Sequence, residues 1–282
     1  MVGMRDVSKK AGVSLSTVSL VVNGNGYVSN DMRDRVRKAM QALNYVPNEL
    51  ARNLYHDRTN LVGVIVPTIR HPFFATFTAH LQHALAAQGL RTMLCSTTDE
   101  TDGEIQYVDM LRRHMMDGIV MCAHTSHPGD YWTSIHRPIV AFDRVLGNGI
   151  SSIGSDHEQG GRLIAQMLIR NGARHVVMIG GPRDQFFDLA VRGEVEEGSF
   201  DLGKTTFPTV RYYLTLEQEL TSAGVKYEYI EAGEVMDFAG YHRAVSRALD
   251  GVATDGVDAV VSSDIGAAFC VREALSRGIS IP

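Results

Sequence analysis

The sequence has no apolar run long enough to cross a membrane, and its first residues lack the basic and apolar stretches of a secretory signal. A membrane-spanning or exported protein is therefore not expected, and we predict a cytoplasmic location. Cysteine is scarce, and the three widely spaced residues Cys95, Cys122 and Cys270 favour reduced, mostly buried thiols over a disulfide or a metal site.

Several motifs of common enzymatic chemistry are also absent. The chain contains no Gly-x-Ser-x-Gly, Cys-x-x-Cys or His-Glu-x-x-His sequence. His114, His124 and His127 lie near one another but lack the tight spacing of metal ligands. We therefore expect no enzymatic activity, no bound metal and no cofactor.

Charge is distributed unevenly along the chain. Residues 1–60 hold nine Lys/Arg against five Asp/Glu, a net charge of +4, whereas residues 61–282 hold 18 against 27, a net charge of -9. A basic end on an acidic body indicates that only the amino-terminal part meets a polyanion.

Residues 1–46 carry three amphipathic helical patterns. The first spans residues 4–11, Gly12 then permits a sharp turn, and Ser14 is a suitable N-cap for the second. The third covers residues 31–44 and is capped by Ser29. Two short helices joined by a glycine turn and supported by a third predict a helix-turn-helix, although a three-helix bundle without nucleic acid has the same pattern.

Residues 4–23 read MRDVSKKAGVSLSTVSLVVN, and this run resembles the DNA-binding headpiece of the LacI/GalR (lactose-repressor/galactose-repressor) family. The resemblance continues as far as Asn48 and implies that double-stranded operator DNA is a partner. It implies base contacts from Leu15, Ser16 and Leu20, and phosphate contacts or positioning roles for Ser14, Thr17, Ser19, Asn23 and Tyr45. Leucine can only contact thymine methyl groups or exclude other groups, so the bases that are read stay open.

Residues 47–60 are interpreted as a hinge and linker. Pro47 begins about two turns of helical pattern, too few for a stable isolated helix, and a plain linker is the alternative. The resemblance implies a hinge helix that pairs with its twin in a homodimer. In that arrangement Ala51 and Leu54 enter the minor groove and kink the operator.

From residue 61 onwards the pattern changes to alternating strands and helices. Strand-like runs occur at 61–66, 91–95, 118–122, 139–142, 176–179, 227–230 and 259–261. This alternation predicts an α/β body of doubly wound parallel sheets covered by helices. Its length favours two sub-domains, about 61–160 and 161–282, with a ligand cleft at the carboxyl ends of the strands.

Aromatic and charged residues follow several of these strands. Residues 71–74 read His-Pro-Phe-Phe, Asp143-Arg144 follows Phe142, and Ser263-Asp264 ends another strand. Rings can stack on a sugar or a base, and carboxylates accept hydrogen bonds from hydroxyls. Each feature alone also fits an ordinary core residue or, for Asp143 and Arg144, a salt bridge.

Together with Gly180-Gly181-Pro182, these segments resemble the effector domain of the same family, which is similar to periplasmic sugar-binding proteins of type I. The resemblance implies effector contacts from Phe73, Phe74, Asp143, Asp264 and an arginine, for which Arg211 is preferred and Arg192 is the rival. Residues 183–207 depart from the family as a glycine-rich acidic insert, expected at the cleft mouth. The family also continues past residue 282 with another strand and an aspartate-bearing loop, so this chain is C-terminally short of the pattern.

We therefore expect a sequence-specific DNA-binding transcriptional regulator, a repressor, whose operator affinity is controlled by a small-molecule effector. Asp143-Arg144 favours a ligand with hydroxyls, so a sugar or polyol is preferred, whereas paired aromatics leave a nucleobase as the alternative. A sugar-binding protein that does not bind DNA would share the body but would need an export signal. The predicted partners are operator DNA, the effector and a second copy of the chain in a homodimer.

Overall fold

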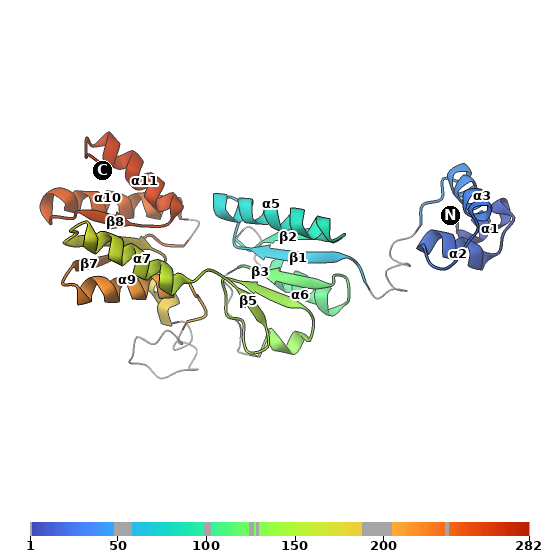
Figure 1. The fold of residues 1–282 in the computed structure, drawn as a ribbon, viewed down its shortest axis with the longest axis horizontal. Helices are drawn as coiled ribbons and strands as arrows, with labels where there is room; N and C mark the ends of the chain where they lie inside the picture. The colour runs from blue at the N-terminus through green and yellow to red at the C-terminus, as the bar shows by residue number, and fades with distance from the viewer. Residues whose placement is uncertain are drawn as a thin grey trace. The chain divides into compact units, whose positions relative to one another are not determined.

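The computed structural model describes residues 2–47, 58–98, 103–123, 127, 130–187, 205–234 and 237–281. The chain divides into two compact units, Met1–Thr59 and Asn60–Pro282, both drawn in Figure 1. Each unit has a hydrophobic core of its own. Nowhere in the described part of the chain is a helix long and apolar enough to cross a membrane.

The first unit contains three helices, α1 (Met4–Ala11), α2 (Leu15–Asn23) and α3 (Asn30–Ala42). Gly12 ends α1 with a left-handed φ of +64°, and the Ser14 hydroxyl accepts the Thr17 N–H at 3.0 Å to cap α2. Ser29 caps α3 in the same way. The predicted helix-turn-helix and both caps are confirmed, although α3 ends before Asn44, whose φ of +47° lies outside the helical region.

The apolar stripes of these three helices meet in one small core. Its buried members come from all three helices and are Val7, Ala11, Val18, Val36 and Ala39. Because these side chains recur at helical spacing, one face of each helix is buried and the other stays available to solvent or a partner.

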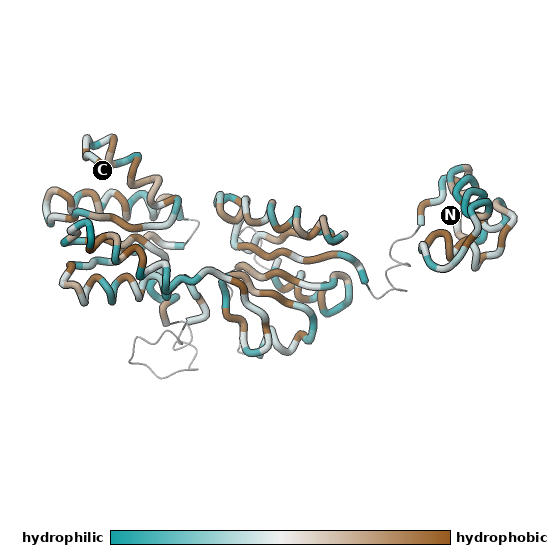
Figure 2. Tube along the Cα trace, in the orientation of Figure 1, coloured by the Kyte–Doolittle hydropathy of each residue, from teal (hydrophilic) through white to brown (hydrophobic). Residues whose placement is uncertain are grey.

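The second unit begins with a five-stranded parallel sheet in the order β2-β1-β3-β4-β5. Its strands are β1 (Leu61–Val66), β2 (Arg91–Ser96), β3 (Gly118–Met121), β4 (Ile139–Phe142) and β5 (Ser151–Ile153), and the central ones, β1, β3 and β4, are largely hydrophobic (Figure 2). The connecting helices are α5 (Pro72–Ala87), α6 (Gly103–Arg112) and the short 3-10 helix η1 (Thr133–Ile135). Strand β5 was not predicted, because its three exposed residues carry no apolar pattern and only their pairing with β4 makes them a strand.

A second parallel sheet follows, in the order β7-β6-β8. Its strands are β6 (His175–Gly180), β7 (Lys226–Glu231) and β8 (Ala259–Val261). The helices of this half are α7 (His157–Arg170), the 3-10 helix η2 (Arg183–Phe187), α9 (Val210–Ser222), α10 (Phe238–Thr254) and α11 (Asp264–Ser276). The predicted parallel α/β body is confirmed, and parallel pairing brings the carboxyl ends of the strands in each sheet to one edge.

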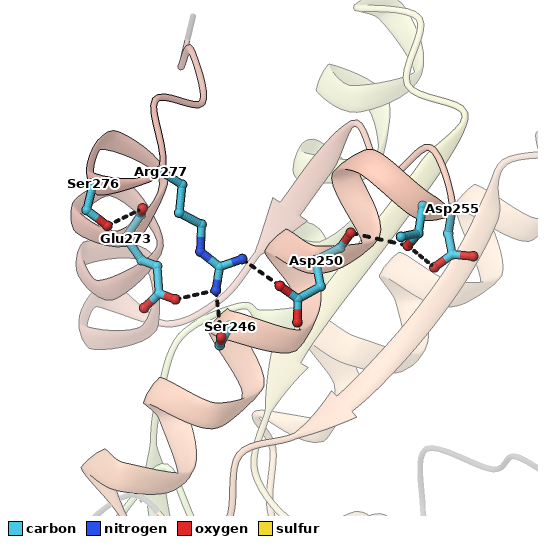
Figure 3. A network of polar contacts seen from close by, with 7 residues as sticks. Ser246, Asp250, Asp255, Glu273, Ser276 and Arg277 are labelled. Carbon is cyan, nitrogen blue, oxygen red and sulfur yellow. Dashed lines mark hydrogen bonds and ion pairs between the residues drawn. The ribbon is translucent and has the colours of Figure 1, made fainter.

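A polar network joins the end of α11 to α10 (Figure 3). The Arg277 guanidinium donates to the Asp250 carboxylate and the Ser246 hydroxyl, each at 2.6 Å, and to the Glu273 carboxylate at 2.5 Å. Asp264 is the first residue of α11, at the opposite end of the helix from this network. These contacts therefore hold α11, the helix that begins with Asp264, against α10.

Candidate functional site

The exposed face of α2 carries the residues predicted to read bases. Leu15 and Leu20 are 43% and 38% exposed, whereas Val18 on the other face of the helix is fully buried. Together with Ser16 and Ser19, Leu15 lines an open groove shared with Gly3, Met4, Arg5, Asp6 and Lys9. Both leucines are exposed, so their side chains are available for contact with thymine methyl groups.

Hydroxyl groups cluster at the start of α2. The Ser14 Oγ lies 2.7 Å from the Ser16 Oγ and 2.8 Å from the Thr17 Oγ1. Further along the helix, the Asn23 side chain donates to the Ser19 hydroxyl at 3.1 Å. A helix N-terminus presents free N–H groups and the positive end of its dipole, so hydroxyl donors there suit a phosphate group.

Arg35 of α3 holds the turn between α1 and α2. Its Nη2 donates to the carbonyls of Ala11 at 2.7 Å and Gly12 at 3.0 Å. A Cβ at Gly12 would lie 2.9 Å from that same nitrogen, which the flexible arginine side chain can move, so glycine is favoured there mainly by its positive φ of +64°. No pattern in the sequence indicates this role of Arg35, because its partners are main-chain atoms.

Tyr45, Ala51 and Leu54 are the remaining residues predicted to contact DNA. Tyr45 is partly buried against the headpiece core, and burial raises the pKa of its hydroxyl. Tyr27, for which no role was predicted, is 92% exposed in the loop between α2 and α3. Ala51 and Leu54 lie outside the described residues, and their role in the minor groove stays a prediction.

A cavity of about 350 Å³ lies in the second unit among loops that follow the carboxyl ends of the strands. Phe73, Phe74, Asp143 and Asp264 all line it. Arg211 is exposed on α9 and is not among its lining residues, and the rival Arg192 lies outside the described residues. Tyr213 of the same helix does line the cavity, and two residues differ by about 200° around a helix, so Arg211 points elsewhere.

Aromatic rings form one wall of this cavity. Phe73 is 44% exposed and packs edge-on against Phe74 with ring centroids 5.1 Å apart. Its ring also stacks with that of Phe142 at 6.1 Å. On α9, Tyr213 lines the cavity and burial raises the pKa of its hydroxyl, which stays protonated and can donate a hydrogen bond. Tyr241 of α10 is a further lining hydroxyl.

Asp143 follows β4 with an unusual backbone conformation, a left-handed φ of +53°. Its Oδ1 lies 2.5 Å from Nε2 of His157, the first residue of α7. The side chain of Arg144 donates to the main-chain carbonyls of Asp143 and Ala123 and lies over the ring of Phe207. The side chain that contacts the Asp143 carboxylate is thus His157, and not its neighbour in sequence.

A second histidine, His71, caps the helix that carries the aromatic wall. Its Nδ1 accepts the Phe73 N–H at 3.2 Å, and its Nε2 lies 3.9 Å from the Asp264 carboxylate. Burial lowers the pKa of His71 more than Asp264 raises it. His71 and His157 were not predicted as lining residues, although both lie at the start of a helix shortly after a strand.

A phosphate-binding pattern also occurs in the chain. Residues 198–205 read GSFDLGKT, which has the spacing of a P-loop, but only Thr205 belongs to the described residues. In a P-loop the final hydroxyl residue opens a helix. Here the Thr205 hydroxyl donates to the Gln185 carbonyl and α9 begins only at Val210, so the pattern lacks its required context. Among the described residues, no group of three His, Cys, Asp or Glu side chains is arranged to hold a metal.

Two family models match successive parts of the chain. Residues 3–48 match the bacterial regulatory proteins of the lacI family, and residues 59–202 match the periplasmic binding proteins and sugar binding domain of the LacI family. Over 292 aligned positions, the chain is 31% identical to the ribose operon repressor of Bacillus subtilis (strain 168). That alignment covers 100% of this chain and 79% of the repressor.

A second relative is the sucrose operon repressor of Streptococcus mutans serotype c (strain ATCC 700610 / UA159), 38% identical over 178 residues. That alignment covers 63% of this chain and 55% of the relative, so the chain spans about half the length of the sucrose operon repressors it matches. The fold matches the crystal structure of the lac repressor dimer bound to operator and the anti-inducer ONPF, with a TM-score of 0.74. The two sequences are 20% identical, and the match covers 99% of this chain and 79% of that chain. The chain belongs to the LacI family of bacterial regulatory proteins.

Proposed function

We propose that this protein is a DNA-binding transcriptional repressor whose operator affinity is set by a sugar or polyol bound in the cleft of the second unit. One observation carries the proposal: the same chain holds a helix-turn-helix with an exposed reading face and a cavity lined by carboxylates, hydroxyls and rings. The names of the relatives, repressors of ribose and sucrose operons, support it.

The headpiece supports DNA as the partner. The exposed Leu15 and Leu20 suit the major groove, and the hydroxyl cluster at the start of α2 suits the phosphate backbone. A single headpiece covers one half-site, so we propose a homodimer on a palindromic operator in the cytoplasm. The net charge of +4 in residues 1–60 agrees with a polyanionic partner.

The cavity favours a ligand with several hydroxyls on an apolar ring face. The carboxylates of Asp143 and Asp264 accept hydrogen bonds, the hydroxyls of Tyr213 and Tyr241 donate them, and the exposed ring of Phe73 offers a stacking surface. A nucleobase would also stack on Phe73, but it offers fewer donors to two carboxylates. The cavity volume of about 350 Å³ lies in the range of small-molecule sites.

The test begins with selection of duplex DNA from a random pool by the full-length protein. We expect a palindromic site whose affinity falls steeply as the salt concentration rises. A thermal-shift screen with sucrose, D-ribose, D-fructose, D-sorbitol, adenine and guanine then identifies the effector class, because a bound ligand raises the melting temperature. A shift by a purine alone would favour the nucleobase alternative, and failure to select any site would contradict the assignment as a DNA-binding regulator.

A further inference from the structure

We infer that residues 153–157, the crossover from β5 to α7, hold the Asp143 carboxylate in the geometry that receives a ligand hydroxyl, and that His157 and Gly154 are positioning residues of the effector site. The inference rests on the proposed function, since it assigns roles around Asp143 in that same cavity. Three observations support it. The Asp143 main chain is hydrogen-bonded to Ile153, its carboxylate contacts His157, and Gly154 has no side chain where the carboxylate lies.

The main chain of Asp143 is fixed first. Strands β4 and β5 pair in parallel as far as Phe142 and Ile153, and the Asp143 N–H then donates to the Ile153 carbonyl at 2.8 Å. This hydrogen bond holds Asp143 at a φ of +53°, a region that aspartate tolerates better than most residues. The backbone therefore leaves the strand direction at the residue whose side chain meets the cavity.

The carboxylate is fixed next, by His157. Its Nε2 lies 2.5 Å from the Asp143 Oδ1, with side chains only 14% and 21% exposed. The histidine opens α7, whose first turn is capped by Asp156 through the Gln159 N–H at 2.9 Å, so its main chain is itself anchored. No residue that the structure describes donates a hydrogen bond to the second oxygen, Oδ2, which leaves that acceptor for a ligand.

Gly154 supplies the space that the carboxylate occupies. A Cβ at this position would lie 2.9 Å from the Asp143 Oδ1 and 3.6 Å from the Asp143 Cα. The φ of Gly154 is not in the left-handed region, so its backbone does not require glycine. An alanine would therefore displace the carboxylate by contact alone while every hydrogen-bond donor stays in place.

These contacts join the two halves of the second unit. Asp143 follows a strand of the first sheet, whereas α7 contributes Ala165 to a core shared with Val176 and Met178 of β6 in the second sheet. A ligand hydroxyl on Oδ2 would thus be bound by a carboxylate that is itself hydrogen-bonded to the second half. Effector binding then depends on the crossover as well as on the residues that touch the ligand.

The experiment uses the full-length protein and isothermal titration calorimetry with sucrose, D-ribose, D-fructose and D-sorbitol. His157→Phe keeps a ring but removes the donor, His157→Gln keeps an amide donor, and Gly154→Ala adds the obstructing methyl group. For whichever sugar binds the wild type, we expect His157→Phe and Gly154→Ala to lose about tenfold or more in affinity, and His157→Gln to stay within about threefold. His80→Phe, at an exposed histidine on α5 outside the cavity, is the matched control and should bind like the wild type.

Each result decides a separate point. If the wild type binds none of the four sugars, the proposed effector class fails and this inference falls with it. If the wild type binds and either His157→Phe or Gly154→Ala binds equally well, the proposed function stands and the role assigned to that residue is wrong. If His157→Gln is as weak as His157→Phe, the donor does not position Asp143. Operator affinity without sugar should be the same in all variants, and a loss there would show general damage to the fold in place of a positioning role.

Discussion

His71 faces Asp264 in the cavity of the second unit, with its Nε2 3.9 Å from the carboxylate Oδ1. Because Nδ1 accepts the Phe73 N–H, the proton of the neutral ring resides on Nε2, on the side of Asp264. The histidine is 5% exposed whereas Asp264 is largely exposed, so burial outweighs the nearby negative charge and lowers the pKa of His71. The cavity therefore holds a neutral histidine whose charging is costly.

This lowered pKa makes stability depend on pH. In the unfolded chain the imidazole returns to its ordinary value of 6.5 and binds a proton more readily than in the folded protein. The contribution of neutral His71 to the unfolding free energy is thus complete above pH 6.5. It is lost as the pH falls below 6.5 towards the lower pKa of the folded protein. Urea denaturation at pH 7.5 and 5.5 should show a larger loss of unfolding free energy for the wild type than for His71→Gln, and equal losses would contradict the assignment.

Phe73 and Phe74 are neighbours that should respond differently to truncation. Phe74 is 8% exposed in the core, so Phe74→Ala should destabilise the protein by about 3 kcal/mol. Phe73 is 44% exposed at the cavity, so Phe73→Ala should change the unfolding free energy much less but weaken sugar binding. Denaturation and calorimetry on both variants check this, and an unaltered sugar affinity in Phe73→Ala would mean that its ring does not stack on the ligand.

Arg35 should matter for the headpiece through its main-chain contacts more than through its charge. Arg35→Ala removes the hydrogen bonds to the Ala11 and Gly12 carbonyls and should destabilise the headpiece by about 1–2 kcal/mol. Arg37→Ala removes the same charge from the same helix and is the control, because no hydrogen bond of Arg37 holds the turn. Circular dichroism melts and operator titrations should separate the two variants, and equal effects would mean that charge alone is responsible.

The cysteines should be unreactive in the native protein. Burial raises the pKa of Cys122 to about 12 and that of Cys270 to about 11, and Cys95 is also buried. Near pH 8 these two thiols are almost entirely protonated, and the thiolate is the reactive form. Labelling with a thiol-reactive disulfide reagent should be slow in the folded protein and fast in urea. Rapid labelling of a folded sample, located by mass spectrometry, would contradict this prediction.

Local sequence determined most of the helices and strands and the class of the fold. Gly12 and Ser14 mark the turn and the cap because a positive φ and a side-chain acceptor are properties of single residues. The alternation of apolar strands with amphipathic helices was likewise sufficient for a parallel α/β body. The positions that follow parallel strands drew attention to Phe73, Phe74, Asp143 and Asp264, and the resemblance to the effector domain of the family implied that they contact one ligand.

Tertiary structure alone decided which side chains meet in that cavity. Strand β5 exists through its pairing with β4. On α9, the direction of each side chain around the helix decides that Tyr213 lines the cavity and Arg211 does not. The partners His157 for Asp143 and Asp264 for His71 come from separate elements of the fold, and no periodicity in the sequence records such a contact. Both pairs depend on how helices and strands pack in three dimensions, which sets the distance between the side chains and their burial.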